Sequence, residues 1–284
     1  MFTSLDHLVI AVRDLDVATT TYATLLGRAP SWRGDHPGAG TANALFRLGN
    51  TYVELLSPVG SGVLGDALVA QLERDGEGPY ALAFGTPDAA ACAASLRANG
   101  VGCSEPFDGS GRERSSGVER QWRLVVLSPA DTRGVRLFAV EHRSPAEVLP
   151  PAVAVDERGA VSGVDHAVIM TADPDAACAL YRDRLALRLA LDRTFEERRV
   201  RLLFFRIAGV TVELAASLDG GRDAVANDRF WGISWRVPNV DAARARLAAA
   251  GCDVSEVRPG NKSGTRVCTV RRETHGVATL LIQQ

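Results

Sequence analysis

The sequence contains few cysteines, and their pattern excludes the usual structural roles of that residue. Five cysteines occur in 284 residues, an odd number, and no two stand in a CxxC spacing. This pattern argues against a disulfide framework and against a zinc site built from cysteine. We therefore expect small apolar thiols in a reducing compartment, and a cytoplasmic protein.

Neither sign of charge dominates, and long apolar runs are missing. Lysine and arginine total 32 against 34 aspartate and glutamate residues, which gives a formal net charge of −2. A nucleic-acid partner is not expected, because binding to phosphates requires a basic face. No segment approaches the roughly 18–20 apolar residues of a membrane span, so no membrane partner is expected. The first residues lack the basic and apolar regions of a signal peptide.

The remaining composition, 46% apolar and 23% charged, is that of an ordinary globular protein. A length of 284 residues suggests one large domain or two smaller ones, at about 100–200 residues per domain. An internal repeat decides between these options. When the chain is shifted along itself, residues 5–10 align with residues 164–169, and Tyr22 aligns with Tyr181. A histidine precedes a glutamate by the same interval in both halves, at 7 and 54 and at 166 and 213, which indicates a duplication.

Each half contains a second, weaker repeat. Residues 80–84 resemble residues 231–235, and each segment is followed by a proline, an alanine-rich stretch and a glycine. The chain therefore divides into four modules, at 1–58, 78–142, 163–217 and 228–284. The proline-rich segment 144–162 is expected to link an N-terminal domain, 1–143, to a C-terminal domain, 163–284.

Each module is expected to have the order strand, helix and three strands. In the first module, alternating apolar residues predict a strand over 5–12, and Asp14 or Asp16 is expected to cap the following helix. Gly27 stands where a helix commonly ends. Strands are predicted near 31–33 and over 43–48 and 51–56, the last two joined by a Gly-Asn turn. The fold class is therefore α+β, with four βαβββ modules in two domains.

A histidine and a glutamate recur in register in strands that are otherwise apolar. A carboxylate in the middle of a strand is costly to bury without a partner. Imidazole and carboxylate together suit a divalent ion such as Zn²⁺, Ni²⁺, Fe²⁺ or Mn²⁺. The same pattern is open to a simpler explanation, as histidine–glutamate ion pairs or as polar positions at a sheet edge. The predicted metal ligands are His7, Glu54, His166 and Glu213.

These motifs resemble the vicinal oxygen chelate superfamily, which includes glyoxalase I, bleomycin-resistance proteins, methylmalonyl-CoA epimerase and extradiol dioxygenases. The resemblance lies in the segment around Asp6-His7, in Tyr22 and Leu26-Gly27, and in Tyr52-Val53-Glu54-Leu55. Residues 34–43 resemble a glyoxalase-like subfamily with a His-Pro…Gly-Thr-Ala-Asn signature. The superfamily implies glyoxalase-like domains whose curved mixed sheets form cups, with metal ligands on the first and last strands of each module.

The second and fourth modules depart from that ligand pattern. Ala81 and Phe138 stand at the expected ligand positions of the second module, and Gly232 and Leu280 at those of the fourth. If consecutive modules pair, each cup keeps two ligands. If the first module pairs with the third, the four ligands form one complete site. Sequence order favours consecutive pairing and the number of ligands favours the other, and we expect consecutive pairing. The missing ligands also disfavour an extradiol dioxygenase.

Further residues are candidates for catalysis or substrate binding. His36 lies in a Gly/Pro-rich turn and is a candidate base, or else a solvated turn residue. The segment 109–114 and the residues after it concentrate arginines that could bind an anion, or that form a solvated hairpin. The predicted catalytic residues are Glu54, Glu213 and His36. The predicted substrate-binding residues are Trp32, Asn43, Arg112, Arg114, Trp122, Phe138 and Trp235.

Three functions follow from these patterns. The first is a metal-dependent isomerase or lyase, in which a divalent ion chelates a small oxygenated substrate and stabilises an enolate-like oxyanion. The second is a metal-free binding or self-resistance protein that sequesters a hydrophobic metabolite. The third is a metal-free enzyme that uses His36 or Glu54 as a base. In each case we expect a small-molecule partner and a monomer or homodimer.

Overall fold

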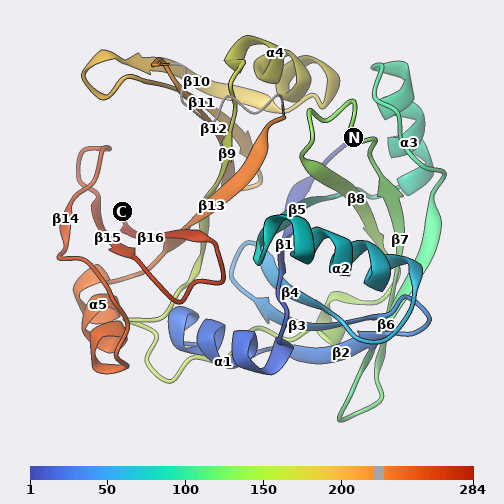
Figure 1. Ribbon diagram of the computed structural model, residues 1–284, viewed down its shortest axis with the longest axis horizontal. Helices are drawn as coiled ribbons and strands as arrows, with labels where there is room; N and C mark the ends of the chain where they lie inside the picture. Colours follow the sequence, from blue (N-terminus) through green and yellow to red (C-terminus); the bar gives the residue numbers. More distant parts are fainter. Residues whose placement is uncertain (220–226) are drawn as a thin grey trace.

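The computed structural model describes residues 1–219 and 227–284, and it contains two eight-stranded curved sheets, one in each half of the chain. Figure 1 shows the halves side by side, with helices on the outside of both sheets. The architecture is α+β, as the sequence predicts. No helix in the described part of the chain is long and apolar enough to cross a membrane.

The N-terminal sheet closes into a barrel with the strand order β1-β4-β3-β2-β6-β7-β8-β5. Its two modules meet where β1 pairs with β5 and where β2 pairs with β6, both antiparallel. The elements of this half are β1 (Ser4–Ala11), α1 (Leu15–Leu26), β2 (Trp32–His36), β3 (Thr41–Arg47), β4 (Tyr52–Pro58), α2 (Val63–Asp75), β5 (Gly78–Gly85), α3 (Ala89–Ala98), β6 (Phe107–Glu113), β7 (Glu119–Val126), β8 (Arg136–His142) and η1 (Ala146–Val148).

The C-terminal sheet has the order β10-β11-β12-β9-β13-β16-β15-β14 and stays open. Its modules meet only where β9 pairs with β13 among the described residues. The elements of this half are β9 (Gly163–Met170), α4 (Pro174–Cys178), η2 (Ala179–Arg184), β10 (Arg188–Phe195), η3 (Glu196–Arg198), β11 (Val200–Ile207), β12 (Val210–Ser217), β13 (Arg229–Arg236), α5 (Val240–Ala249), β14 (Arg258–Pro259), β15 (Arg266–Val270) and β16 (Ala278–Gln283).

The strand order shows that consecutive modules pair, and it excludes the alternative in which the first module joins the third. His7 and His166 consequently lie in different sheets. The register also shows which positions of the two modules correspond, because an approximate two-fold axis between the modules exchanges β1 with β5 and β4 with β8. The cross-strand pair His7–Ala83 corresponds to the pair Ala81–Val9, and the pair Val9–Glu54 corresponds to the pair Ala83–Phe138. Ala81 and Phe138 therefore do occupy the positions where a second histidine and glutamate would stand.

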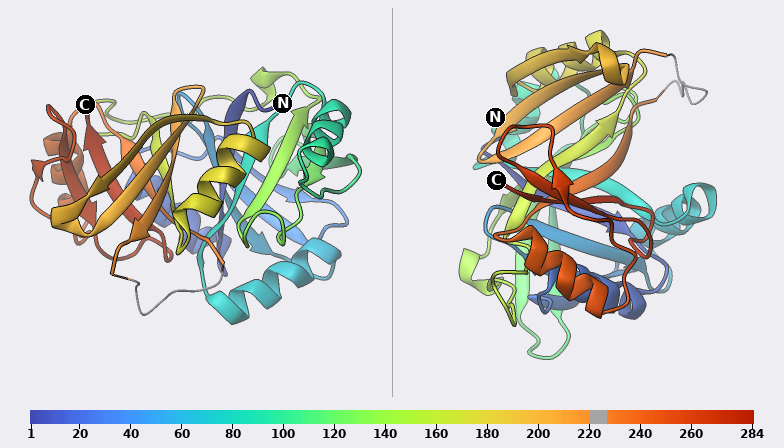
Figure 2. Two further views of the ribbon diagram at one scale, coloured as in Figure 1. Left: turned by 90° about the horizontal axis from the view of Figure 1, so that it is seen from above. Right: turned by 90° about the vertical axis from the view of Figure 1, so that its left-hand side faces the viewer.

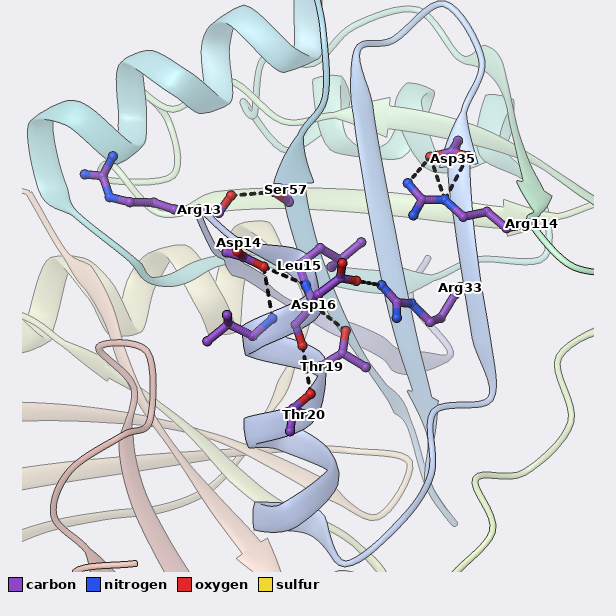
Figure 3. Close-up of polar contacts among 11 residues, drawn as sticks. Arg13, Asp14, Leu15, Asp16, Thr19, Thr20, Arg33, Asp35, Ser57 and Arg114 are labelled. Carbon is purple, nitrogen blue, oxygen red and sulfur yellow. Dashed lines mark hydrogen bonds and ion pairs between the residues drawn. The ribbon is translucent and has the colours of Figure 1, made fainter.

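Local sequence signals define the first module. Asp14, not Asp16, caps α1, and its side chain accepts hydrogen bonds from the backbone N–H groups of Asp16 at 2.9 Å and Val17 at 3.0 Å (Figure 3). Gly27 ends the helix with a φ of 67°, a left-handed conformation that favours glycine. The Gly49-Asn50 turn joins β3 and β4 as predicted.

Helix α2 lies in a stretch that the sequence patterns did not assign, and it covers one end of the barrel (Figures 1 and 2). Its buried Leu68 and Leu72 pack with Val9 and Leu56 from the barrel interior and with Tyr80. The helix begins close to the turn before β3, because a Cβ atom on Gly65 would lie 2.4 Å from the carbonyl oxygen of Gly40. Glycine at this position permits the close approach of the two backbones.

Residues 146–152 cover a second part of the barrel. Leu149 packs with Trp32 and Leu45, and Val148 contacts the same cluster. The two halves also share one continuous hydrophobic core, which includes Leu8 and Phe46 of the first half and Trp235 of the second. Helix α2 and the segment after β8 therefore each cover part of the barrel interior.

Candidate active site in the N-terminal cup

The inner face of the N-terminal barrel, here called the N-terminal cup, holds His7 and Glu54. Alternation along β1 and β4 points these two side chains inward, whereas Leu8 and Val53 point outward into the core. His7 Nε2 lies 3.6 Å from Glu54 Oε2, and the two residues are 8% and 9% exposed. The structure therefore brings together the histidine and the glutamate that the repeat predicted as a pair.

A neighbouring carboxylate orients His7. Asp6 Oδ1 lies 2.7 Å from His7 Nδ1, and Asp6 Oδ2 lies 2.9 Å from His142 Nε2. Burial by itself raises the pKa of the Asp6 carboxyl, but hydrogen bonds from His142 and His7 outweigh burial and hold that pKa well below its usual range. With Nδ1–H donated to Asp6, the Nε2 lone pair of His7 faces Glu54. This carboxylate–histidine arrangement is common behind metal ligands, and sequence reasoning missed it although Asp6 directly precedes His7.

His36 joins the same cup, as the last residue of β2 and not as a solvated turn residue. Its Nδ1 lies 2.8 Å from Thr41 Oγ1, and its Nε2 lies 3.8 Å from Glu54 Oε1. Asn43 Nδ2 donates to Glu54 Oε1 at 2.7 Å and contacts His36 Nε2 at 3.1 Å. Burial lowers the pKa of His36, so the neutral ring is favoured. The predicted residues His36, Asn43 and Glu54 therefore form one connected group.

Aromatic side chains and glycines shape the walls around this group. The Trp122 indole lies over Gly109 and Gly111, where an added Cβ would contact it. The same ring meets His36 edge-on, with ring centroids 5.8 Å apart. Tyr52 stacks on His7 at 4.5 Å between centroids. Trp32 and Trp122, predicted as substrate contacts, thus line the cup beside the polar group, and Phe138 packs near α2.

The arginines of the β6–β7 hairpin divide into two groups. Arg112 and Arg114 are exposed, and Arg114 pairs with Asp35 at 2.7 Å on the outer surface (Figure 3). Arg112 and Arg114, both predicted to bind substrate, therefore lie outside the cup. Arg120 belongs to the same arginine-rich stretch but was not among the predicted substrate-binding residues; it is 8% exposed and lies against the Trp32 and Tyr52 rings, at 5.7 and 5.4 Å from their centroids. Arg120 is two residues from Trp122 on β7 and so shares its face of the sheet, which is the sequence signal that could have identified Arg120.

The concave face of the second sheet, here called the C-terminal cup, repeats the core of this arrangement. His166 Nε2 lies 3.5 Å from Glu213 Oε2, and His166 Nδ1 lies 2.9 Å from Asp165 Oδ2. Ser234 Oγ also contacts His166 Nε2, at 2.7 Å. Burial raises the pKa of Glu213. Apolar side chains line the part of this cup next to the pair, and they include Val168, Met170, Leu202, Phe204 and Ala215.

Trp235 has a different place from the one predicted. Its side chain is fully buried in the shared core. Along β13 it alternates with Ser234, which faces His166, so the indole points to the opposite side of the sheet. Trp235 therefore stabilises the fold and lies outside the C-terminal cup.

The donor types in the N-terminal cup suit a divalent ion, because two imidazole nitrogens face the two oxygens of one carboxylate. Within residues 1–219 and 227–284, however, no three His, Cys, Asp or Glu side chains are already arranged to hold a metal ion. His7 and Glu54 are the residues that would hold such an ion in this cup. The C-terminal cup offers the pair His166 and Glu213.

Two curved sheets, each with a histidine–glutamate pair on its concave face, are the features that the resemblance implies, and comparison with known families agrees with it. The chain belongs to the glyoxalase-like domain family, whose pattern matches residues 5–185. Residues 165–269 match the glyoxalase/bleomycin resistance protein/dioxygenase superfamily. The resemblance to the vicinal oxygen chelate superfamily is thereby confirmed.

Individual relatives cover the chain to different extents. An ethylmalonyl-CoA/methylmalonyl-CoA epimerase from Cereibacter sphaeroides is 39% identical over 62 residues, which are 22% of this chain and 46% of that protein. The match thus spans less than half the length of this curated relative. A mutant of 4-hydroxymandelate synthase from Streptomyces coelicolor has a TM-score of 0.73 at 14% identity, covering 99% of this chain and 92% of that one.

A hypothetical protein from Staphylococcus aureus has a TM-score of 0.66 at 10% identity and covers 98% of both chains. At these identities the two solved structures share the fold of this chain. Both extend over nearly all of it, so the arrangement of the two halves is found in other proteins.

Proposed function

We propose that the protein is a metal-dependent enzyme that acts on a small oxygenated metabolite in the N-terminal cup, by isomerase or lyase chemistry through an enolate-like intermediate. The observation that carries this proposal is the contact between His7 Nε2 and Glu54 Oε2 at 3.6 Å, with His7 Nδ1 held by Asp6. Two electron-rich groups that face each other in a buried site favour a cation or a proton between them.

Glu54 is the proposed base. Its carboxylate takes a proton from the carbon next to a substrate carbonyl, and the electron pair of that C–H bond moves to the carbonyl oxygen. Return of the proton to the opposite face or to a neighbouring carbon completes an isomerisation, whereas loss of a neighbouring leaving group completes a lyase reaction. Asn43 fixes Glu54 through a 2.7 Å hydrogen bond, and neutral His36 is a second group able to accept the proton.

A divalent ion at His7 and Glu54 would supply Lewis-acid stabilisation of the enolate oxygen. Zn²⁺, Ni²⁺, Fe²⁺ and Mn²⁺ all suit these donors. The name of the epimerase relative describes a reaction of the proposed kind. Glu213 and His166, 3.5 Å apart, are proposed as a second pair of the same type.

The alternative is a metal-free protein that sequesters a hydrophobic metabolite. The apolar lining of the C-terminal cup, with Val168, Leu202 and Phe204 around a single histidine–glutamate pair, favours it. On that alternative, replacing His7 leaves ligand affinity unchanged.

Metal content decides between the two. We expect the purified protein, after reconstitution with each of the four metals in turn, to retain about one divalent ion in the N-terminal cup, and His7→Ala to lose it. His166→Ala should leave that ion in place, because the two histidines lie in separate sheets. His275→Gln is the matched control, since the His275 ring contacts Glu77 and not the histidine or glutamate of either cup. Retention of well under one ion per chain by the wild type, measured by elemental analysis, contradicts the proposal.

A further inference from the structure

Arg120 is a buried cation inside the N-terminal cup that the proposed chemistry does not yet use. It pairs across the sheet with Gly111, and an added side chain at Gly111 would contact the His36 ring and the Trp122 indole. Residues directly opposite in a sheet point to the same face. Arg120 therefore shares the inner face of the barrel with His36.

No carboxylate of the described residues lies within ion-pair distance of the Arg120 guanidinium. Burial of a charge without an opposite charge costs free energy of folding. Stacking on Trp32 and Tyr52, at 5.7 and 5.4 Å, offsets part of that cost. The planar fork of N–H donors remains available to an anion from outside the chain.

A second group in the cup also lacks a partner. Asn43 Oδ1 is buried without a hydrogen bond, although the amide nitrogen of the same side chain contacts both Glu54 and His36. A buried acceptor of this kind is uncommon, because its desolvation is uncompensated. The cup thus presents one cation without an anionic partner and one acceptor without a donor around the proposed base.

We propose that Arg120 binds a carboxylate of the substrate, and that the substrate is a small carboxylate-bearing carbonyl compound with a hydroxyl or N–H group directed at Asn43 Oδ1. This inference rests on the proposed function for the position of the reacting carbon near Glu54. A guanidinium binds a carboxylate through two parallel hydrogen bonds, which fixes the orientation of the ligand as well as its affinity.

Pyruvate is a suitable probe, and methyl pyruvate is its neutral match. We expect isothermal titration calorimetry to show that pyruvate binds the wild type and that Arg120→Met weakens binding by about ten- to a hundredfold. Methyl pyruvate should bind both proteins equally. Arg123→Met is the control, because Arg123 lies on the same strand and pairs with Asp108 on its outer side.

Thermal unfolding separates a binding role from a structural one. Removing an uncompensated charge should leave the Tm of ligand-free Arg120→Met unchanged or higher, and pyruvate should raise the Tm of the wild type only. A lowered Tm with unchanged pyruvate affinity overturns the proposal, as does the absence of pyruvate binding to the wild type at millimolar concentration. Tighter binding of inorganic phosphate than of pyruvate overturns the assignment to a carboxylate.

The same titrations on His7→Ala distinguish failure of this inference from failure of the proposed function. Arg120-dependent pyruvate binding that is the same in the wild type and in His7→Ala, with a wild type that retains no metal, keeps the inference and contradicts the metal-dependent function. A metal that depends on His7, together with pyruvate affinity that does not depend on Arg120, keeps the function and contradicts the inference.

Discussion

At the scale of single residues, the side chain next to each cup histidine determines what that histidine can do. Asp6 and Asp165 each directly precede their histidine and each contact its Nδ1, at 2.7 and 2.9 Å. The Nε2 atom is thereby turned towards Glu54 or Glu213. The two cups differ in what else contacts the histidine–glutamate pair: His36 and Asn43 contact Glu54 in the first cup, whereas the Ser234 hydroxyl contacts His166 in the second.

Replacement of Asp6 should reveal this role through stability and its pH dependence. Hydrogen bonds from His142 and His7 depress the Asp6 pKa in the folded protein. A depressed carboxyl pKa stabilises the fold above the ordinary value of about 3.9, and this contribution is lost as the pH falls towards the folded-state pKa. We expect Asp6→Asn to cost about 1–3 kcal/mol at pH 7 and little in strong acid.

Urea unfolding at a series of pH values measures this difference. Asp16→Asn is the control, because Asp16 is an exposed ion-pair partner of Arg33 and its loss should change stability little. A pH-independent effect of Asp6→Asn would mean that its carboxylate charge contributes nothing to folding.

At the scale of elements, the strands follow the sequence closely and α2 does not. Alternation along β1 and β4 gives one cup face and one core face, with Glu54 and Leu56 on the cup face of β4 and Val53 and Leu55 on its core face. Helix α2 buries Leu68 and Leu72 but exposes Val63 and Val69, so its apolar pattern is weak. Its position depends on a backbone contact with the turn before β3, and a contact of this kind leaves no periodic pattern of apolar residues in the sequence.

A side chain at Gly65 should displace α2 from the turn before β3. We expect Gly65→Ala to lower the free energy of unfolding by about 1–3 kcal/mol, because the new methyl group would collide with the Gly40 carbonyl oxygen. Alanine would otherwise stabilise a helix by about 1 kcal/mol relative to glycine. Displacement of α2 should also increase acrylamide quenching of tryptophan fluorescence, since Trp32 and Trp122 lie inside the cup.

Val69→Ala is the matched control on the same helix, because Val69 is an exposed residue. It should leave both stability and quenching near the wild-type values. If Gly65→Ala behaves like this control, α2 does not depend on the close approach at Gly40.

At the scale of the whole molecule, the two halves form one structural unit. A single hydrophobic core extends through both, and polar contacts join them at several points. Tyr22 donates to the Thr274 carbonyl oxygen at 3.2 Å, and Asn50 donates to that of Val164 at 2.8 Å. Arg133 pairs with the nearly inaccessible Asp228 at 2.9 Å. The halves are therefore expected to unfold together.

The Arg133–Asp228 pair tests this coupling. Asp228→Asn leaves Arg133 without its anionic partner at the junction of the halves, so we expect a loss of about 1–3 kcal/mol in a single unfolding transition. Asp219→Asn, which removes an exposed partner of Arg199, should have little effect. Separate transitions in calorimetry, with only one shifted by Asp228→Asn, would show that the halves are independent.

The sequence by itself determined the repeat, the modules and the histidine–glutamate pairs, because pleat alternation and helix signals are local and survive in the order of residues. It also predicted Asn43 and Trp122 near the site through motif and composition. The tertiary structure alone decided that consecutive modules pair, that the first sheet closes, and that His36 and Arg120 point inward while Arg112 and Arg114 face solvent. These features depend on contacts between strands far apart in the chain, whose free energy is gained only when both partners are folded.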